Sequence, residues 1–378
     1  MSAPALRNTV RTKRERLGLS QHALAEVVGV SRQAIIAIEA SRQVPSTSLA
    51  LQLARALRCG VEEIFSLSAS EGLSVRLAPP ERPSGPPDRG ERSDGTRVAV
   101  GEVDGRWIAH PLPADPTLAA DGIVARGITN RTAIVRPLVA LDQLRGNVLV
   151  SGCAPVLASL AQRVGRRSAD ARATWLPAGS KRSLDLLEAG LVHVAGVHFA
   201  GGGAGEDNVE VVRRRFAGQR MLVINLIRWR QGLVVPPGNP LAVRTAAALL
   251  RPGIKLARRE EGAAAHKLLA TLLAREGVEK PVLSGPLAGG HAEVAQLVRC
   301  GAADVGVAIE GVALAHGLDF VPLTEERFDL VVRAEAAETV PVSRLLDTLD
   351  DEAFRTEVAH LPGYDVGIVG HVITVEAP

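Results

Sequence analysis

Aromatic residues are scarce in this sequence of 378 residues, since Trp, Tyr and Phe together make up only 3% of it. A surface that stacks nucleobases or sugars on rows of aromatic rings is therefore disfavoured, and small and aliphatic residues must build the cores. Cysteine is also rare. Cys59, Cys153 and Cys300 are odd in number and far apart, which excludes a disulfide framework or a metal finger and predicts a reducing, cytoplasmic compartment.

Long apolar runs and catalytic motifs are absent from the sequence as well. No uninterrupted apolar stretch reaches about 18 residues, and no apolar stretch of signal-peptide length follows the basic N-terminus. There is no GxxxxGK(S/T), HExxH or GxSxG motif. The glycine-rich run Gly201–Gly205 lacks a convincing helix after it and is interpreted as a flexible loop. We therefore expect a protein that is not an enzyme, meets no membrane, and carries no cofactor and no resident metal.

The positive charge is concentrated at the front of the chain. The net charge is +3, yet residues 1–58 contain nine Lys or Arg against three Asp or Glu. This segment alone carries +6, so the rest of the chain sums to −3. A small, strongly basic segment attracts a polyanion such as DNA.

Composition divides the chain into four parts. Residues 1–68 have dense helical periodicity, and residues 69–95 are rich in Pro, Gly and charge, which predicts a flexible linker. Residues 96–146 predict a small β-containing connector, in which Asp104-Gly105 favours a tight hairpin turn. In residues 147–378, strand-like runs such as MLVINLI, GLVVPP, LDFVPL and FDLVV alternate with helical ones such as Ala263–Arg275, which is typical of parallel sheets covered on both faces.

The first part predicts a bundle of about five short helices. Ser20 is placed to cap a helix over residues 21–28, and Gly29 supplies the sharp turn after it. Ser31 then caps a helix over residues 32–39. Two short helices joined by a tight turn are the elements of a helix-turn-helix.

The exposed face of the second of these helices suits the major groove of DNA. Arg32 can address guanine, Gln33 can address adenine, and an alanine methyl can touch thymine. Residues at helix ends and in the following turn can hold phosphates. The expected DNA-binding residues are Arg14, Gln21, Ser31, Arg32, Gln33, Ala34, Ala37, Arg42 and Gln43.

From about Leu6 to Leu67 the sequence closely resembles the helix-turn-helix modules of the lambda and 434 repressor and Cro class, also called the XRE type. The resemblance implies that the helix after Ser31 enters the major groove, with Gln21 and Gln33 at commonly used contact positions. It also implies a homodimer on double-stranded, pseudo-palindromic operator DNA. A solvated helical bundle without a role in DNA binding is the alternative interpretation.

Two strand-to-helix transitions in the last part suit an anion. One apolar strand ends at Ser151, Gly152 and Cys153 before a helix, and Gly179-Ser180 precede a second helix. Helix N-termini present free N–H groups and a favourable dipole. Two such helix starts can face one crevice at the carboxyl ends of parallel strands.

These segments, together with a helix expected over Arg258–Leu269, resemble the type II periplasmic-binding-protein fold. The resemblance is closest to intracellular binding-protein-like domains fused to helix-turn-helix modules, and more distant to molybdate-binding proteins. It implies two crossing strands, near Arg228–Val234 and Phe320–Leu330. The predicted fold is thus multidomain, an all-α lambda repressor-like bundle followed by an α/β two-lobed domain. The implied lobes are residues 147–229 with 330–378, and residues 230–329.

The same resemblance implies a ligand cleft between the lobes. Ser151 and Ser180 match positions that bind oxyanions in the molybdate proteins, whereas Cys153 and His291 depart from that pattern. The predicted function is a one-component transcription regulator controlled by a small effector, either an oxyanion such as molybdate or tungstate or another metabolite. A metal- or thiol-responsive regulator that uses Cys153, His291 and His198 stays open as an alternative. The candidate ligand-binding residues are Ser151, Gly152, Cys153, Gly179, Ser180, Lys181, His291 and Tyr364.

Overall fold

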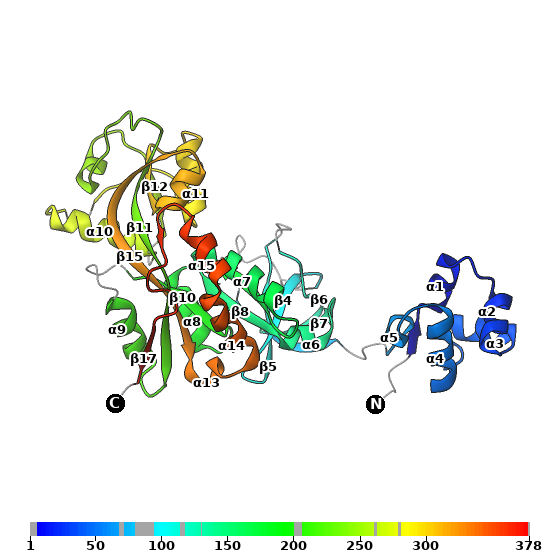
Figure 1. The fold of residues 1–378 in the computed structure, drawn as a ribbon. Coiled ribbons are helices and arrows are strands. Elements are labelled where there is room, and N and C mark those ends of the chain that lie inside the picture. The colour runs from blue at the N-terminus through cyan, green and yellow to red at the C-terminus, as the bar shows by residue number, and fades with distance from the viewer. Residues whose placement is uncertain are drawn as a thin grey trace. The chain divides into compact units, whose positions relative to one another are not determined.

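The computed structural model describes residues 6–67, 72–79, 94–113, 118–129, 131–199, 206–260, 263–278 and 281–376. The chain divides into two compact units, Met1–Gly72 and Leu73–Pro378, which are described separately (Figure 1). Within the described ranges, no helix combines the length and the hydropathy that crossing a lipid bilayer needs.

The first unit is a bundle of short helices. Leu24, Ile35, Ile38 and Leu53 are fully buried at its centre. The predicted caps are confirmed, because the hydroxyls of Ser20 and Ser31 each accept a hydrogen bond from the backbone N–H three residues ahead, at 3.0 and 3.1 Å. The elements are β1 (Leu6–Asn8), α1 (Val10–Arg16), α2 (Gln21–Val28), α3 (Arg32–Glu39), α4 (Thr47–Ala56), α5 (Val61–Ile64) and β2 (Phe65–Leu67), with β1 antiparallel to β2.

The second unit begins with a small closed barrel. Its strands are β3 (Leu73–Leu77), β4 (Arg97–Val103), β5 (Arg106–Pro111), β6 (Gly122–Thr129) and β7 (Thr132–Pro137), joined in the order β3-β5-β4-β6-β7. The predicted hairpin is confirmed, since β4 and β5 are antiparallel and the turn residues Asp104 and Gly105 have φ of 49° and 70°. Such left-handed pairs match the twist of a hairpin.

The predicted flexible linker over residues 69–95 is wrong where the structure describes it as β3. Val75 and Leu77 are buried in the barrel, and β3 pairs with β5 and β7. This short alternating segment is too brief to stand out beside the proline-rich run that follows it, and tertiary pairing decides its structure. Residues 69–71 and 80–93 of the predicted linker lie outside the described residues.

The barrel packs directly on the sheet that follows it. The Asn147 amide donates hydrogen bonds to the backbone oxygen of Val100 at 2.7 Å and to the carboxylate of Asp121 at 3.2 Å, on the far side of the junction. Ile108 of the barrel and Leu149 of the sheet belong to one buried apolar cluster. The barrel is therefore part of the larger unit rather than a loose connector.

A large mixed sheet forms the rest of the second unit, with ten strands among the described residues. Along the sheet the order is β13-β12-β14-β11-β15-β10-β8-β9, and β16 and β17 pair with β11. The strands are β8 (Asn147–Gly152), β9 (Arg172–Pro177), β10 (Val194–Val197), β11 (Met221–Val235), β12 (Leu256–Arg259), β13 (Leu287–Ala288), β14 (Val305–Ile309), β15 (Asp319–Arg333), β16 (Tyr364–Asp365) and β17 (Val372–Val375).

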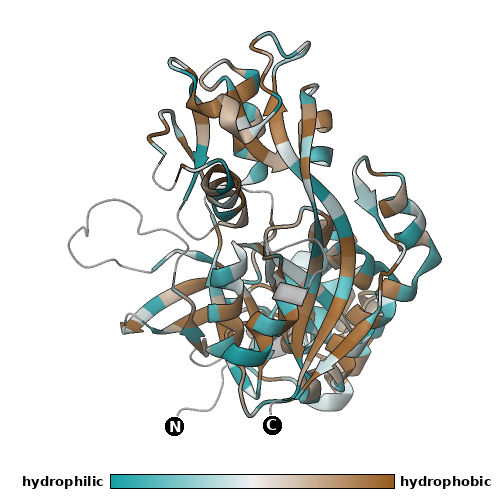
Figure 2. Ribbon diagram, turned by 90° about the vertical axis from the view of Figure 1, so that its left-hand side faces the viewer, coloured by the Kyte–Doolittle hydropathy of each residue, from teal (hydrophilic) through white to brown (hydrophobic). Residues whose placement is uncertain are grey.

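The two crossing strands are confirmed. β11 and β15 are 15 residues each and pair antiparallel along their whole length. β10, β8 and β9 extend the sheet at one end of this ribbon, and β14, β12 and β13 extend it at the other. We call the halves built on β8–β10 and on β12–β14 the first and second lobe. Figure 2 shows hydrophilic residues in the middle of the long ribbon and hydrophobic ones where each lobe packs on it.

Helices cover both lobes (Figure 1). Those that follow the barrel or pack on the first lobe are α6 (Leu141–Arg145), α7 (Val156–Arg167), α8 (Ser180–Glu188), α9 (Glu206–Arg215), α13 (Ala334–Ala337), α14 (Val340–Asp347), the 3-10 turn Thr348–Asp350 and α15 (Glu352–Ala359). The second lobe carries the 3-10 turn Ala246–Leu250, α10 (Ala264–Arg275), α11 (His291–Arg299) and α12 (Glu310–Ala315).

Two predictions on local structure are wrong. The helix expected over Arg258–Leu269 begins only at Ala264, as the helical run predicted over Ala263–Arg275 indicates, because Leu256 and Ala257 are buried in β12 beside β14. A helix, α9, does follow the glycine-rich run Gly201–Gly205, which itself lies outside the described residues. The buried side chain of Asn208 anchors α9 by donating to the Asp329 carboxylate at 2.8 Å, a long-range contact that local patterning does not reveal.

Candidate functional site

The helix-turn-helix places a compact polar face at the start of α3. Arg32 and Gln33 are exposed in its first turn, and Ala34 and Ala37 are half-buried along the same helix. Ser31 is exposed but its hydroxyl caps the helix, so that α3 begins at a fixed residue. Arg42 and Gln43 are exposed in the turn that follows. These side chains are free to meet a groove.

Arg14 departs from its predicted role as a phosphate ligand. Its guanidinium is buried and donates to both carboxylate oxygens of Glu39, at 2.6 and 3.2 Å, and to the backbone oxygen of Leu19. The Gln21 amide donates to the same carboxylate at 2.9 Å. Burial raises the pKa of Glu39, but the hydrogen bonds from Arg14 and Gln21 lower it further, so the net shift is downward. Arg14 thus joins α1 to the end of α3.

At the place predicted for the cleft, where the two lobes of the second unit meet, a thiol and two imidazoles come together. Cys153 follows β8 and His198 follows β10, both in the first lobe, whereas His291 is the first residue of α11 in the second lobe. One ligand atom from each of the three lies within 4.8 Å of the others. Both imidazoles are buried and Cys153 is half-buried.

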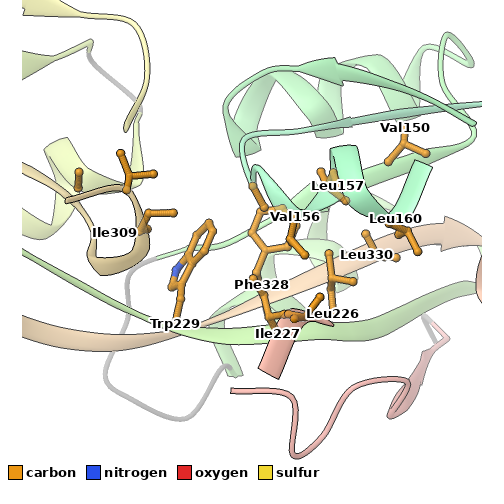
Figure 3. Close-up of a cluster of buried hydrophobic side chains, with 14 of the residues drawn as sticks. Val150, Val156, Leu157, Leu160, Leu226, Ile227, Trp229, Ile309, Phe328 and Leu330 are labelled. Carbon is orange, nitrogen blue, oxygen red and sulfur yellow. The ribbon is translucent and has the colours of Figure 1, made fainter. Parts of the chain in front are cut away.

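Apolar and aromatic side chains surround this cluster. The His198 ring meets Trp229 edge-on at 4.9 Å between ring centroids, and the Trp229 ring lies 5.9 Å from that of His291. Figure 3 shows Trp229 and Phe328 between Ile309 of the second lobe and Leu157 of the first. The side chains around the cluster therefore come from both lobes and from the ribbon between them.

The electrostatics of the two imidazoles are opposite. Burial lowers the pKa of His198, but the charges and hydrogen bonds of Cys153 and Glu326 raise it more, to about 10. For His291, burial together with the positive charges of Arg259 and His198 holds the pKa well below its ordinary value. His291 is therefore a neutral imidazole at physiological pH, with a lone pair available.

Three polar side chains in this region are buried without full hydrogen bonding. Among the described residues, no partner is found for Nδ1 of His291, for Oε1 of Glu326 or for either amide atom of Gln231. Gln231 lies two residues beyond Trp229 in β11, and thus on the same face of the strand. Buried polar atoms are normally paired, so their concentration beside one cleft indicates a binding site.

The serines predicted to bind an oxyanion are engaged within the protein. The Ser151 hydroxyl is fully buried and bonds that of Ser183 at 3.0 Å. The Ser180 hydroxyl accepts from the His198 N–H and donates to the His198 carbonyl oxygen, both at 3.0 Å. These hydroxyls hold the first lobe together, and Ser180 fixes the backbone that presents the His198 imidazole.

The other predicted ligand residues divide between the cleft and its surroundings. Gly152 is buried, and its carbonyl oxygen accepts from the Trp175 indole at 2.8 Å. Gly179 is the N-cap of α8, and Lys181 is exposed. Tyr364 faces Trp229 at 6.4 Å between ring centroids, and burial together with nearby Cys153 raises the pKa of its phenol above the ordinary value.

A hollow opens in the second lobe beside β12. It has a volume of about 510 Å³ and is lined by apolar residues together with Arg258, Arg259, Glu260 and His266. The charge of Arg259, one of its lining residues, lowers the pKa of His291 in the cleft. The volume lies in the range of small-molecule sites.

Glu326 and Trp229 were not predicted as site residues from the sequence. His198 was named only for the alternative, a metal- or thiol-responsive regulator. Trp229 and Glu326 are directly paired in register across β11 and β15. The available signal was a run of charged residues, TEER, inside a predicted crossing strand. A carboxylate in the middle of a strand that must be buried needs a partner, and that partner is His198.

Comparison with known proteins adds two family matches. Residues 161–350 match the model described as the PBP superfamily domain, and residues 10–64 match a helix-turn-helix model. The chain is 29% identical over 197 residues to the uncharacterized protein YvgK of Bacillus subtilis. That match covers 52% of this chain and 63% of YvgK, so the chain spans less than two thirds of this relative's length.

The N-terminal helix-turn-helix segment has its own relatives. It is 52% identical over 63 residues to an uncharacterized HTH-type transcriptional regulator of Methanothermobacter thermautotrophicus, a match that covers 16% of this chain and 91% of that protein. Among solved structures, an ABC-type phosphate transport receptor from Vibrio cholerae is similar with a TM-score of 0.43 and 13% identity. It covers 57% of this chain and 98% of the receptor.

Proposed function

Because the chain belongs to the family described as the PBP superfamily domain and carries a helix-turn-helix at its front, we propose that it is a ligand-controlled, one-component transcription regulator. The helix-turn-helix binds operator DNA. The two-lobed domain binds a small effector in the cytoplasm and changes the affinity of the protein for that DNA.

The DNA-binding part of the proposal rests on α3. Ser31 sets the first residue of the helix, and the exposed side chains of its first turn are an arginine and a glutamine, which form bidentate contacts with guanine and adenine. The Gln21 amide nitrogen donates to the Glu39 carboxylate, so only the amide oxygen of Gln21, at the start of α2, is left to accept a hydrogen bond from DNA. A homodimer on a two-fold site follows from the helix-turn-helix class.

The effector part rests on the incompletely bonded polar groups between the lobes. A ligand that reaches the His291 ring nitrogen, the free oxygen of Glu326 or the Gln231 amide would satisfy groups that are buried at a cost in free energy. Glu326 and Gln231 belong to the two strands of the ribbon, whereas His291 begins α11 of the second lobe. A ligand that contacts them together therefore favours one arrangement of that lobe on the ribbon.

The class of effector follows from the atoms that are available. The hydroxyls of Ser151 and Ser180 are occupied, which weakens the case for a tetrahedral oxyanion such as molybdate or tungstate. The thiol and imidazoles of the cluster are electron-pair donors. They therefore favour an effector that accepts electron pairs over an oxyanion. Molybdate stays a second candidate because the N-cap of α8 supplies no side-chain hydrogen bond, and the N–H groups of its first turn are available to an anion.

The experiment is a gel shift with the full chain on duplex DNA from upstream of its own gene and on random duplex, at ordinary salt. We expect preference for the first DNA. Arg32→Ala should weaken specific binding about 5- to 150-fold, as one lost bidentate contact does, with less effect on random DNA. Arg106→Ala removes the same charge from an exposed position of the barrel and should leave the preference intact. Equal affinity for both duplexes would refute the proposal.

A further inference from the structure

The cluster in the cleft has the donor set of a thiophilic metal site. Cys153 offers a sulfur, and His198 and His291 each offer a ring nitrogen, all within 4.8 Å of one another. The arrangement contains two imidazoles and one thiolate precursor and no dominant set of carboxylates. Such a set suits Zn²⁺ or Cu⁺ rather than Mg²⁺ or Ca²⁺, which prefer oxygen ligands.

His198 is oriented as a metal-binding histidine is. Its Nδ1 bonds the Glu326 carboxylate at 2.8 Å, and the same oxygen accepts from the Trp229 indole at 3.3 Å. With Nδ1 held in this way, Nε2 is left to face the cluster. A carboxylate behind a histidine ligand fixes the tautomer and the direction of the ring.

His291 supplies an independent indication. Its side chain is buried, with the residue 5% exposed, and its Nδ1 has no hydrogen-bond partner in the described part of the chain. Three further buried atoms in the region, Oε1 of Glu326 and both amide atoms of Gln231, are likewise without partners among the described residues. A histidine with a purely structural role would have hydrogen bonds at both ring nitrogens. A histidine that binds a metal needs a ring nitrogen with a free lone pair.

We propose that Cys153, His198 and His291 bind one thiophilic metal ion of the Zn²⁺ or Cu⁺ class. On binding, the Cys153 thiol and the Nε2–H of His198 each release a proton to solvent, so that the thiolate sulfur and the neutral imidazole nitrogen can form bonds to the metal. Three protein ligands leave a fourth position of a tetrahedral ion open.

The ion ties the two lobes together. Cys153 and His198 belong to the first lobe, and His291 begins α11 of the second. Bonds of about 2.3 Å to sulfur and 2.0–2.1 Å to nitrogen place tetrahedral ligand atoms roughly 3.3–3.6 Å apart, and the three ligand atoms already lie within 4.8 Å of one another. Coordination therefore fixes the start of α11 against the first lobe. That this link between the lobes changes DNA binding rests on the proposed function, but metal binding does not.

The test is titration of the metal-free full chain. Zn²⁺ is measured by calorimetry against a chelator of known affinity, Cu⁺ by competition with a chromogenic chelator, and Co²⁺ as a spectroscopic probe for Zn²⁺. We expect one equivalent of Zn²⁺ or Cu⁺ per chain, and with Co²⁺ a thiolate-to-metal charge-transfer band and the intense visible bands of tetrahedral coordination.

Variants identify the ligands. Cys153→Ser should abolish the charge-transfer band, and His291→Gln should weaken binding by more than 100-fold. Glu326→Gln, which changes only the group behind His198, should weaken binding about 10- to 100-fold. Cys300→Ser is the matched control, because Cys300 is exposed and outside the cluster, and should bind as the unaltered chain does. Circular dichroism spectra confirm that each variant is folded.

The proposal is overturned if the folded chain binds neither Zn²⁺ nor Cu⁺ more tightly than Cys153→Ser, or if Cys300→Ser alone removes the Co²⁺ band. Preference for the upstream DNA, measured on the same preparation, separates the two proposals. Specific DNA binding without metal binding overturns the metal site and leaves the regulator standing. Metal binding without specific DNA binding overturns the regulator and leaves the metal site standing.

Discussion

At the scale of single residues, the roles of Cys153, His291 and two buried serines depend on which groups face each side chain. Cys153 and His291 stood out because they depart from an oxyanion-binding pattern, and the structure brings them together with His198. Ser151 and Ser180, which fitted that pattern, have hydroxyls that serve the protein itself. A side chain's role depends on what faces it in space, and 138 residues separate Cys153 from His291 in the sequence.

Arg14 gives a prediction of the same kind. Arg14→Ala leaves the Glu39 carboxylate buried without its cation, which should lower the free energy of unfolding of the helical unit by about 3 kcal/mol. Hydrogen exchange of amides in α2 and α3, followed by mass spectrometry, should accelerate on the order of 100-fold. Arg55→Ala, at an exposed position of α4, is the control. Unchanged exchange in Arg14→Ala would show that the ion pair does not hold the unit together.

His110 predicts a dependence of stability on pH. Burial lowers its pKa from 6.5 to about 4 in the folded chain, so between these values the unfolded chain binds more protons. The stabilising contribution is complete above pH 6.5 and is lost as the pH falls toward 4, at about 1.4 kcal/mol per pH unit. Burial shifts the pKa of His193 in the same direction.

Urea unfolding of the full chain at pH 7 and pH 5, followed by tryptophan fluorescence, measures this effect. The three tryptophans, Trp107, Trp175 and Trp229, all lie in the larger unit. His110→Gln, which keeps a donor for the Leu191 carbonyl oxygen, should remove about 2 kcal/mol of the loss between the two pH values. An equal loss in both chains would assign the pH dependence to other groups.

At the scale of elements, local signals predicted the helix-turn-helix almost residue by residue, because caps and turns act within one helical turn. α2 and α3 have the bounds expected from Ser20, Gly29 and Ser31. The elements that the sequence missed, β3 and α9, are decided by distant partners. β3 is a strand because β5 and β7 pair with it. The five residues of β3 alone do not reveal these pairing partners.

Gly29 tests the local part of this account. It has a φ of +70° at the end of α2, with no atom near enough to obstruct a Cβ, so Gly29→Ala costs backbone strain alone, about 1 kcal/mol. Gly165→Ala is an instructive comparison, because Gly165 lies within α7 and alanine should stabilise that helix by about 0.5–1 kcal/mol. Hydrogen exchange in α2 and in α7 should thus change in opposite directions. A change in exchange rate of the same sign in both helices would contradict the roles assigned to Gly29 and Gly165.

At the scale of the whole molecule, the sequence predicted a two-lobed domain behind a helix-turn-helix, with two crossing strands. The strongly apolar ends of β11 and β15 and their polar middles made each look like two strands, since no local pattern tells a strand that leaves one core and enters another from a pair of short ones. Trp229 and Glu326 lie in that polar middle, where the Glu326 carboxylate bonds Nδ1 of His198. The middle of the ribbon therefore orients one residue of the proposed metal site.

The most direct measurement is the affinity of the full chain for duplex DNA from upstream of its own gene, by fluorescence anisotropy, with and without saturating Zn²⁺ and, in parallel, molybdate. A coupling of about 1–3 kcal/mol corresponds to a change of roughly 5- to 150-fold. We expect a change of this size with Zn²⁺ for the unaltered chain and for Cys300→Ser, and none for Cys153→Ser. DNA affinity that is the same in every ligand condition would contradict control of the helix-turn-helix by the cleft.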